Sequence, residues 1–341
     1  MFIFKIKYYL KRLGIIGAIR QQLFKRGIGE FDSYEYIYNR YYSKLNSDDY
    51  KGELRDWYKY ITETNKDPLV NPTTFNEKIQ WLKLNNNTEL KTKCADKLSV
   101  RDYIGKKIGS DYLVPLYGVW DKFEDINFSN LPNKMIFKST TGSGRYKIIK
   151  NKNEINYNEL KKSMDKWQNL IYGYAGMEIQ YLDIDRKIIC EKLLNMNGPS
   201  VIDYKIHSFN GRPLIIEYIS DRKGKFCSES WFDINWNVLK ITMDSEKYKN
   251  HKIIPKPPKK LNEMLNIASK LSQDFIYVRV DLYEIDEKIY FGELTFTPAN
   301  GVDNWNEKES QKYVGDLIRL PNETNLSNNQ IENIIKKLQY K

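Results

Sequence analysis

The sequence predicts a mixed α+β (α/β-like) fold, because segments with the apolar spacing of helices alternate with pairs of short strands separated by turns. The helical segments dominate the first third of the chain, and the strand pairs lie further along it. Three strand pairs carry the prediction: residues 277–283 with 290–301, residues 201–209 with 213–219, and residues 134–138 with 146–150.

The composition is that of a globular protein with a basic surface. The chain has 341 residues, of which 41% are hydrophobic and 29% charged, enough for two or three subdomains with a core. The net charge of +11 favours acidic partners, namely nucleotides, anionic glycans, anionic lipid or nucleic acid. The three widely spaced cysteines and two histidines do not have the spacing of zinc ligands. The small, odd number of cysteines also gives no sign of disulfide bonds, so a reducing, cytoplasmic setting is expected.

The first 30 residues combine basic charge with large apolar side chains. Seven basic residues stand there against one acid, Glu30. No run approaches the ~20 apolar residues of a membrane span, and the short apolar run at residues 13–19 has no cleavage site of a signal peptide. Two interpretations stay open: a basic amphipathic helix that lies on an anionic membrane surface, or a helix that packs on the body of the protein.

The other elements follow in chain order. Residues 31–70 have helical character, and Thr74 with Glu77 forms a capping-box pattern that opens the next helix. A further helix is expected from about Asp96 to Lys106. The remaining expected elements are an extended segment at 112–120, a helix at 155–185, a strand at 186–194, a polar break at 195–199, a helix at 261–271 and a C-terminal helix from about residue 329.

A glycine-containing loop, residues 139–144, joins strand to strand. This connection excludes the phosphate loop that joins a strand to a helix, and no G-x-x-x-x-G-K-[ST] motif occurs in the chain. A Gly-Ser-Gly tip can instead fold over a triphosphate and offer backbone N–H groups to it, with Lys138 as a point charge at the strand end. The alternative is an ordinary hairpin tip.

The last strand pair carries a set of charges on one face. Side chains alternate along a strand, so an odd-numbered loop, Asp286 to Lys288, would place Asp281 opposite Glu293 and Arg279 opposite Thr295. Two facing carboxylates beside an arginine suit Mg²⁺ that holds phosphate oxygens. The alternative is a solvated face with salt bridges. The other face is apolar and can pack on a core: Val278, Val280, Leu282 and Leu294.

The order of these residues resembles that of the ATP-grasp enzymes, such as D-alanine–D-alanine ligase. The resemblance is closer to the TupA-like branch of that superfamily, which is associated with bacterial surface-polysaccharide gene clusters. It extends from about residue 70 to Pro321 and is carried by residues 74–83, 203–205, 209–211 and 291–296. The order is Lys97 before a helix, Lys138 before the glycine loop, Glu191 at the end of a strand, Asp203 and Lys205 on the next strand, and Arg279, Asp281, Glu293 and Thr295 on the last hairpin.

The resemblance implies an ATP-grasp fold, in which two α+β lobes clasp ATP, preceded by an N-terminal helical extension. The implied segments are a basic helical extension (1–70), a pre-ATP-grasp region (71–131), a first lobe with a lid loop (132–194), a second lobe with the metal site (195–321) and a C-terminal helix (322–341).

The resemblance also implies a role for each candidate site residue. Lys205 and Arg279 would stabilise the transferring phosphoryl group as catalytic residues. Lys97 and Lys138 would reach the ATP phosphates, a lid and a hinge would hold the nucleotide, and Asp203 would contact the ribose. The lid residues are Gly142, Ser143 and Gly144, the hinge residues are Glu191, Lys192, Leu193 and Leu194, and the magnesium ligands are Asp281, Glu293 and Thr295.

The chain departs from the pattern of the superfamily at two places. Many ATP-grasp enzymes have an asparagine as their third metal ligand, where this chain has Thr295. The TupA-like loop often carries an Asn-His pair before Gly-Ser-Gly, where this chain has Thr140 and Thr141. A hydroxyl can ligate Mg²⁺, so Thr295 can still serve as a ligand. Both departures leave ATP binding possible, and they bear on the activity and on the identity of the substrate.

The function that the resemblance implies is an ADP-producing ligase that uses ATP and Mg²⁺. A carboxylate is activated as an acylphosphate and joined to an amine, which forms an amide on a sugar acid, or an amino-acid decoration, of a capsule or cell-surface polysaccharide precursor. The expected partners are ATP, an acidic sugar or glycan precursor and an amine or amino acid, but not nucleic acid. The expected location is the cytoplasm, peripheral at the inner face of the membrane if residues 1–30 bind lipid.

Two alternatives remain at the level of the sequence. The first is a glycosyltransferase or a sugar kinase of the same pathway. A glycosyltransferase would normally need a compact pair of acids, for which Asp183 and Asp185 are the candidates. The second is a non-catalytic ATP-grasp-like protein that binds glycan or nucleic acid, although no nucleic-acid recognition motif is present.

Overall fold

The computed structural model describes residues 1–194, 201–221 and 225–340, so the expected polar break at 195–199 lies outside the described residues. The helices are α1 (Phe2–Lys25), α2 (Ser33–Arg40), α3 (Tyr50–Thr62), α4 (Phe75–Asn85), α5 (Glu89–Ala95), α6 (Val100–Ile108), α7 (Tyr157–Asn169), α8 (Leu261–Ser272), α9 (Lys308–Leu317) and α10 (Asn328–Leu338). The strands are β1 (Leu116–Trp120), β2 (Met135–Ser139), β3 (Tyr146–Ile149), β4 (Ile188–Lys192), β5 (Asp203–Phe209), β6 (Arg212–Ser220), β7 (Cys227–Asp233), β8 (Tyr248–Asn250), β9 (Tyr277–Ile285) and β10 (Lys288–Thr295).

The expected helix starts are confirmed where capping residues specify them. The Thr74 hydroxyl accepts a hydrogen bond from the Glu77 amide, and the Glu77 carboxylate accepts one from the Thr74 amide, so the capping box opens α4. Two expectations of helix length are wrong. The helix expected from Asp96 begins only at Val100, as α6, and Lys97 lies in the break between α6 and α5, which was not expected. The helix expected at 155–185 ends with α7 at Asn169.

The smaller of the two sheets, sheet A, has the strand order β1-β4-β2-β3 and is antiparallel throughout. Helix α7 packs on it, and Leu160, Met164 and Trp167 of α7 share a buried cluster with Met135 and Phe137 of β2. The glycine loop joins β2 to β3 at one end of this sheet. The domain limits given above remain predictions.

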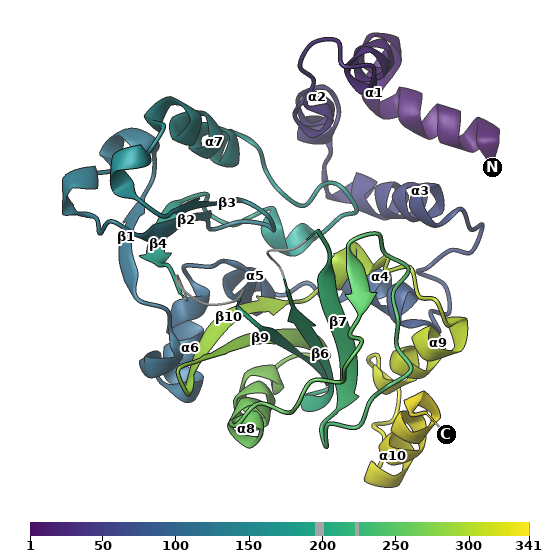
Figure 1. Cartoon of the computed structure of the whole chain (residues 1–341). Coiled ribbons are helices and arrows are strands. Elements are labelled where there is room, and N and C mark those ends of the chain that lie inside the picture. Colours follow the sequence, from purple (N-terminus) through teal and green to yellow (C-terminus); the bar gives the residue numbers. More distant parts are fainter. Residues whose placement is uncertain (195–200, 222–224, 341) are drawn as a thin grey trace.

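The larger sheet, sheet B, has the order β10-β9-β5-β6-β7-β8 and is antiparallel except between β7 and β8. One of its faces packs on α8, where Met264 and Leu271 join the apolar side chains of β9 in one buried cluster. Helices α4, α9 and α10 contribute to a second buried cluster. This cluster also contains Phe209, the last residue of β5, and Tyr277, the first residue of β9. Figure 1 shows sheet A above sheet B, with α8 beneath sheet B.

The residues of the hairpin β9–β10 pair as predicted, although the turn between the strands is shorter than predicted. Asp281 pairs with Glu293, and Arg279 pairs with Thr295, as the alternation of side chains predicted. The turn, however, has two residues, Asp286 and Glu287, both with positive φ, rather than three. The register then shifts by one residue at Gly292, a β-bulge that restores the predicted pairing.

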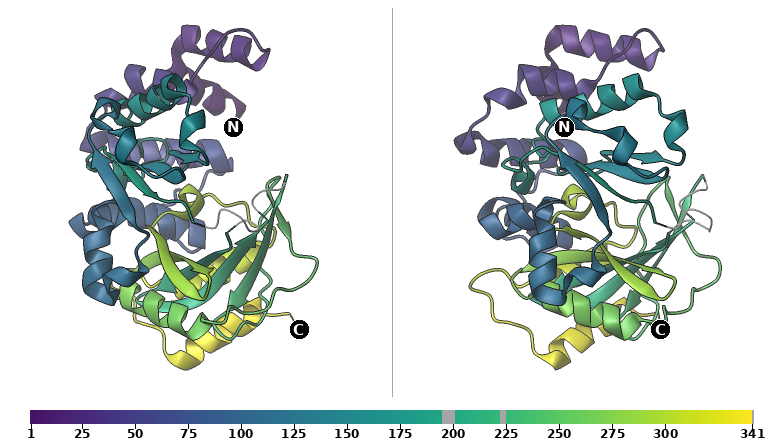
Figure 2. Two further views of the ribbon diagram at one scale, coloured as in Figure 1. Left: turned by 60° about the vertical axis from the view of Figure 1, so that its left-hand side comes forward. Right: turned by 90° about the vertical axis from the view of Figure 1, so that its left-hand side faces the viewer.

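The N-terminal helices form a separate group at the end of the molecule that is remote from α9 and α10 (Figure 2). Helix α1 is interrupted at Gly14, where φ is 64°, a value that favours glycine. Tyr8 and Leu13 of α1 are buried, and Tyr8 packs with Leu54 and Trp57 of α3. Among the described helices, none is long and apolar enough to cross a membrane.

Candidate functional site

The polar face of sheet B carries a row of charged side chains across neighbouring strands. The strand pairings place Glu293 beside Asp281, Asp281 beside Lys205, and Lys205 beside Glu217. Arg279 and His207 form the adjacent pair in the next row. Because residues paired across antiparallel strands point to the same face, the order of the strands alone gathers these side chains.

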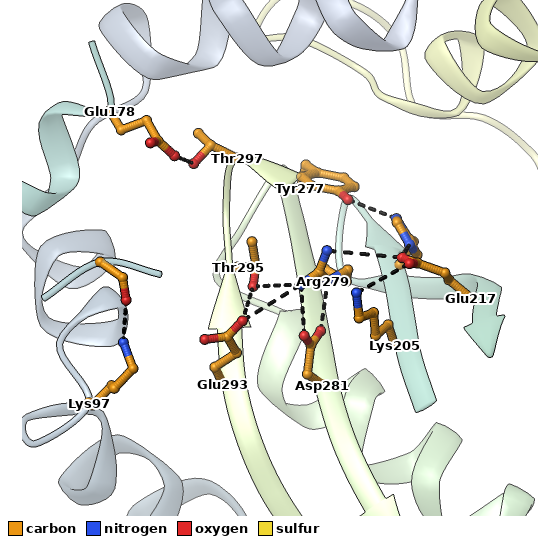
Figure 3. Close-up of polar contacts among 12 residues, drawn as sticks. Lys97, Glu178, Lys205, Glu217, Tyr277, Arg279, Asp281, Glu293, Thr295 and Thr297 are labelled. Carbon is orange, nitrogen blue, oxygen red and sulfur yellow. Dashed lines mark hydrogen bonds and ion pairs between the residues drawn. The ribbon is translucent and has the colours of Figure 1, made fainter. Parts of the chain in front are cut away.

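Arg279 lies at the centre of this group of charged side chains (Figure 3). Its Nε and one terminal nitrogen donate to the two oxygens of Asp281, each at 2.7 Å. The same terminal nitrogen donates to the Thr295 hydroxyl at 3.2 Å and lies 3.7 Å from Glu293 Oε1. Arg279 is only 8% exposed, so a fork of hydrogen bonds to a carboxylate replaces the water that it has lost.

Glu217 of β6 balances the positive charges on the other side of Arg279. Its Oε1 accepts from Lys205 Nζ at 3.2 Å, and its Oε2 lies 3.3 Å from His207 Nε2 and 4.0 Å from a terminal nitrogen of Arg279. The other nitrogen of His207 is 2.8 Å from the hydroxyl of Tyr277. The carboxylate of Glu217 therefore helps to hold both predicted catalytic cations, Lys205 and Arg279, in position.

The pKa values of the cluster follow from burial and from these pairings. Burial raises the pKa of Asp281 to about 6, although Arg279 lowers it. Burial works against the charge of Glu217, but Lys205, His207 and Arg279 together hold the pKa of Glu217 well below its usual range. Burial likewise opposes the charge of Glu293, and Lys97 and Arg279 lower its pKa. The cluster therefore contains charged groups that can meet phosphate and metal ions at neutral pH.

The proposed magnesium ligands fit the ion in their chemistry. Asp281 and Glu293 face each other across two strands, and the Thr295 hydroxyl donates to Glu293 at 3.2 Å. All three offer oxygen, which is the donor that Mg²⁺ prefers. Both oxygens of Asp281 are engaged by Arg279, but each carboxylate oxygen retains a second lone pair. The Glu293 side chain is 42% exposed, so it is the more accessible of the two carboxylates.

The glycine loop lies against Lys97. The backbone N–H of Lys97 donates to the Thr140 carbonyl at 3.2 Å, and Lys97 Nζ donates to the Gly142 carbonyl at 2.5 Å. Gly142 and Gly144 both have positive φ, of 74° and 72°. A Cβ on Gly142 would lie 2.6 Å from the ring of Tyr172, so the loop passes too close to that ring for a larger residue.

Two cavities meet at this cluster. The larger has a volume of about 610 Å³, within the usual range of ligand pockets, and its lining includes Gly142, Ser143, Lys205, Arg279, Glu293 and Thr295. The smaller lies beside Lys97, Lys138 and Glu191 and also touches Glu293. Most of the predicted site residues therefore border one of two adjoining spaces.

The smaller cavity is nearly closed in this structure. Glu191 is held by Lys138 at 2.7 Å and by Arg101 at 3.0 Å. The space that remains is about 30 Å³, room for roughly two water molecules at 10–15 Å³ each. A nucleotide base would enter only after these ion pairs rearrange.

The other predicted residues lie around these cavities without being part of their described lining, and they include the predicted magnesium ligand Asp281, which is buried behind Arg279. Lys192 ends β4 and is exposed, and Leu193 and Leu194 follow it, directly before residues that are not described. Asp203 is buried at the start of β5, two residues before Lys205 and on the same face. Gly144 is exposed at the tip of the loop.

Several residues of the larger cavity were not assigned a role from the sequence. They are His207, Glu217, Glu229 and Asp303. Glu217 interrupts the apolar run at 213–219, which is a signal that sequence reasoning could have used. Glu229 lies on β7, a strand that was not expected. By contrast, Asp183 and Asp185, the candidates for a glycosyltransferase motif, are exposed and are absent from the described lining of both cavities.

Comparison with known proteins places the chain among ATP-grasp sequences. The sequence model of a family described as TupA-like ATPgrasp matches residues 77–319, more than half of the chain. No curated protein matches the sequence.

Solved structures give a more distant likeness. D-Alanine–D-alanine ligase from Bacillus anthracis is 17% identical, covers 72% of this chain and has a TM-score of 0.40. D-Alanine–D-alanine ligase from Helicobacter pylori is 15% identical over 72% of this chain, and L-amino acid ligase from Bacillus licheniformis is 15% identical over 73%, with TM-scores of 0.39 and 0.38. The chain spans 66%, 69% and 53% of the three ligases, just under two thirds of the first.

Proposed function

The chain belongs to the TupA-like ATP-grasp family, and we propose that it is an ATP- and Mg²⁺-dependent carboxylate–amine ligase. It would release ADP when the carboxylate becomes an acylphosphate, and inorganic phosphate when the amine displaces it to form the amide. The proposed product is an amide on a sugar acid, or an amino-acid decoration, of a capsule or cell-surface polysaccharide precursor. The choice of a surface glycan follows from the resemblance to the TupA-like branch, and the basic net charge of +11 is compatible with an acidic substrate.

The observation that carries the proposal is the buried charge row around Arg279, which borders a cavity whose other side is formed by the glycine loop. The chemistry that ATP and Mg²⁺ supply when bound is the conversion of a carboxylate into an acylphosphate, which an amine then attacks. Lys205 and Arg279 would stabilise negative charge on the transferring group, because they are held in place before the reaction and are shielded from water. Asp281, Glu293 and Thr295 would hold the metal ion.

The remaining predicted residues would bind the nucleotide. Lys97 and Lys138 border the smaller cavity from two sides and would contact phosphate oxygens as point charges. Gly142, Ser143 and Gly144 would act as a lid, with Glu191 to Leu194 at the hinge and Asp203 near the ribose. Because the Lys138–Glu191 and Arg101–Glu191 ion pairs now fill the space, we expect nucleotide binding to open them.

The function is tested by measuring ADP release from ATP with a panel of uronic acids and amines. We expect ADP release that requires Mg²⁺, a carboxylate and an amine together. Glu293→Gln should reduce the rate at least about 100-fold and weaken the Mg²⁺-dependent binding of ATP in calorimetry. Glu284→Gln, on the same hairpin but outside the described cavity lining, is the matched control.

The same assay separates the alternatives. Release of ADP with a sugar hydroxyl and no amine would indicate a sugar kinase, and turnover of a nucleotide sugar would indicate a glycosyltransferase. A folded protein that binds ATP without turnover across the panel would favour the non-catalytic alternative. Any of these results would overturn the ligase proposal.

We further propose that α1 attaches the protein to an anionic membrane surface at the cytoplasmic face. Several apolar side chains of α1 point to solvent, including Phe2 (76% exposed), Ile15 (72%) and Ile16 (65%). A groove of about 360 Å³ runs between the two halves of the helix and is lined mainly by apolar side chains. The alternative, that α1 only packs on the body, accounts for Leu13, which is buried, but not for Ile16.

Liposome flotation tests this attachment. Full-length protein should float with vesicles that contain phosphatidylserine and stay behind with neutral vesicles, and about 0.5 M salt should weaken the binding. Ile15→Ser with Ile16→Ser should abolish flotation. The control is Ile253→Ser with Ile254→Ser, an equally exposed apolar pair far along the chain. Flotation that is unaffected by the α1 substitutions would show that this helix is not the anchor.

A further inference from the structure

The larger cavity is acidic although the chain as a whole is basic. Its described lining contains two side chains that are permanently cationic, Lys205 and Arg279. It also contains six carboxylates: Glu178, Glu217, Glu229, Asp244, Glu293 and Asp303. With a net charge of +11 for the chain, this excess of acids is a local property of the cavity, which indicates a positively charged occupant.

Four of the six carboxylates already have polar partners. Glu178 accepts a hydrogen bond from the Thr297 hydroxyl at 2.6 Å, and Asp244 accepts one from the Asn304 amide at 3.1 Å. Glu217 is balanced by Lys205, His207 and Arg279, and Glu293 lies beside Arg279 and Thr295, as described above. These four groups need no further ligand to account for their positions.

Glu229 and Asp303 differ from the other four. Glu229 is 3% exposed on β7 and forms no ion pair within the described chain. The indole N–H of Trp231 and the charge of Lys205 lower its pKa, but by less than burial and the charge of Glu217 raise it. The Asp303 side chain, in the segment after β10, likewise forms no ion pair among the described residues. An ionised carboxylate that is buried without a cation costs free energy, so Glu229 is expected either to hold a proton or to bind a cation.

The electrostatics of the two groups agree with their geometry. Burial, and then the charge of Glu217, raises the pKa of Glu229 to about 8, and the charge of Asp303 adds to this rise. Burial, and then Glu217, raises the pKa of Asp303 to about 6. A cation placed between them would lower both pKa values and relieve the repulsion.

The walls of this part of the cavity favour an organic cation over a metal ion. The rings of Trp231 and Trp305 lie 6.4 Å apart and both line the cavity, together with Tyr248. Aromatic faces attract ammonium groups.

We propose that Glu229 and Asp303 form the subsite that binds the ammonium group of the amine substrate, beside the aromatic wall. This rests on the proposed ligase function and specifies it: the substrate to be activated lies at the cationic end of the cavity, near Lys205 and Arg279, and the cationic amine lies at the acidic end. The subsite selects for positive charge, and the ammonium group passes a proton to one of these carboxylates before its nitrogen attacks the acylphosphate.

The experiment is calorimetric titration of the full chain at pH 7 without nucleotide. The probes are D-glucosamine, ethanolamine and L-alanine amide, each compared with its neutral counterpart, D-glucose, ethylene glycol and lactamide. We expect at least one cation to bind about tenfold more tightly than its counterpart. Because binding lowers the pKa of Glu229 from about 8, it should release a proton, measured by repeating the titration in buffers of different ionisation enthalpy.

The variants make the test specific. Glu229→Gln with Asp303→Asn should remove both the preference for cations and the proton release. Each single substitution should reduce the preference, so the test does not depend on the folding of the double variant. Glu246→Gln removes an exposed carboxylate outside the described lining and should change neither. Substituted proteins should retain the circular dichroism spectrum of the wild type.

The outcomes separate this proposal from the proposed function. The subsite is overturned if no cation of the panel binds better than its neutral counterpart, or if the preference survives the double substitution. Amine-dependent ADP release without cation preference would leave the ligase function standing and remove the subsite. Cation preference without ATP turnover would support the subsite and remove the ligase function.

Discussion

The two ends of the larger cavity differ in how their charges are balanced. At the end formed by β9, β5 and β6, Arg279 and Lys205 meet Asp281 and Glu217 in short ion pairs. At the end formed by β7, Glu229 has no ion pair within the described chain. The first end is a network of paired charges. At the second end, Lys205 only partly offsets the effects of burial and Glu217 on the pKa of Glu229.

This difference separates structural from binding roles. A paired buried charge holds its neighbours in position, and it is costly to break because the partner is then left alone. An unpaired buried carboxylate lowers the stability of the protein, and such groups persist where function requires them. Substitutions at the two ends should therefore change stability in opposite directions, which the following predictions test from the largest expected effect to the smallest.

Arg279→Ala should break the network at the paired end. It leaves Asp281 and Glu217 without their shared cation, so the free energy of unfolding in urea should fall by about 3–5 kcal/mol at pH 7. Arg20→Ala, at an exposed position on α1, should change it by less than about 0.5 kcal/mol. A loss below about 1 kcal/mol for Arg279→Ala would mean that the network is not a structural unit.

Glu217→Gln should destabilise the protein by about 3 kcal/mol at pH 7, since it leaves Lys205 and Arg279 without a counter-charge. Because Lys205, His207 and Arg279 lower the pKa of Glu217 despite burial, its stabilising contribution is present above the unfolded pKa of about 4.3 and is lost as the pH falls below that value. The difference from the wild type should therefore shrink in acid. Urea unfolding between pH 3 and pH 7 measures this, and a constant difference would contradict the lowered pKa.

Glu229→Gln should have the opposite sign. Burial and the charge of Glu217 raise the pKa of Glu229 to about 8, so the wild-type carboxyl costs stability that grows as the pH rises from about 4.3 and is complete above pH 8. Removing the charge should stabilise the protein by about 2 kcal/mol at pH 9 and by little at pH 4.5. Glu246→Gln is the control for a simple change of net charge. Destabilisation at pH 9 would show that Glu229 has a partner after all.

Substitution of Thr295 should have the smallest effect. Its hydroxyl links Arg279 and Glu293 through two hydrogen bonds of 3.2 Å, each worth roughly 1 kcal/mol or less. Thr295→Ala should therefore lower the free energy of unfolding by about 1 kcal/mol. Thr295→Asn, which restores the residue common at this position in ATP-grasp enzymes, should strengthen the Mg²⁺ dependence of ATP binding in calorimetry. Equal Mg²⁺ dependence in both variants would exclude residue 295 as a ligand.

Sequence reasoning recovered the elements whose signals are local. The Thr74 capping box, the Asn210-Gly211 turn between β5 and β6, and the alternation along β9 and β10 all depend on residues a few positions apart. The pairing of Asp281 with Glu293 followed from that alternation. The turn itself was predicted with the wrong length, because a bulge at Gly292 corrects the register in a way that the pattern does not reveal.

The order of the strands, by contrast, was decided only by the tertiary structure. Strand β5 pairs with β9, whose sequence lies some seventy residues away, and this brings Lys205 beside Asp281. Strand β7, which was not expected, carries Glu229 to the acidic end of the cavity. By itself the sequence determined which residues share a face of each strand, because side chains alternate along any strand. Which faces meet depends on long-range pairing and on burial of the apolar face against α8, and those contacts exist only once the chain has folded.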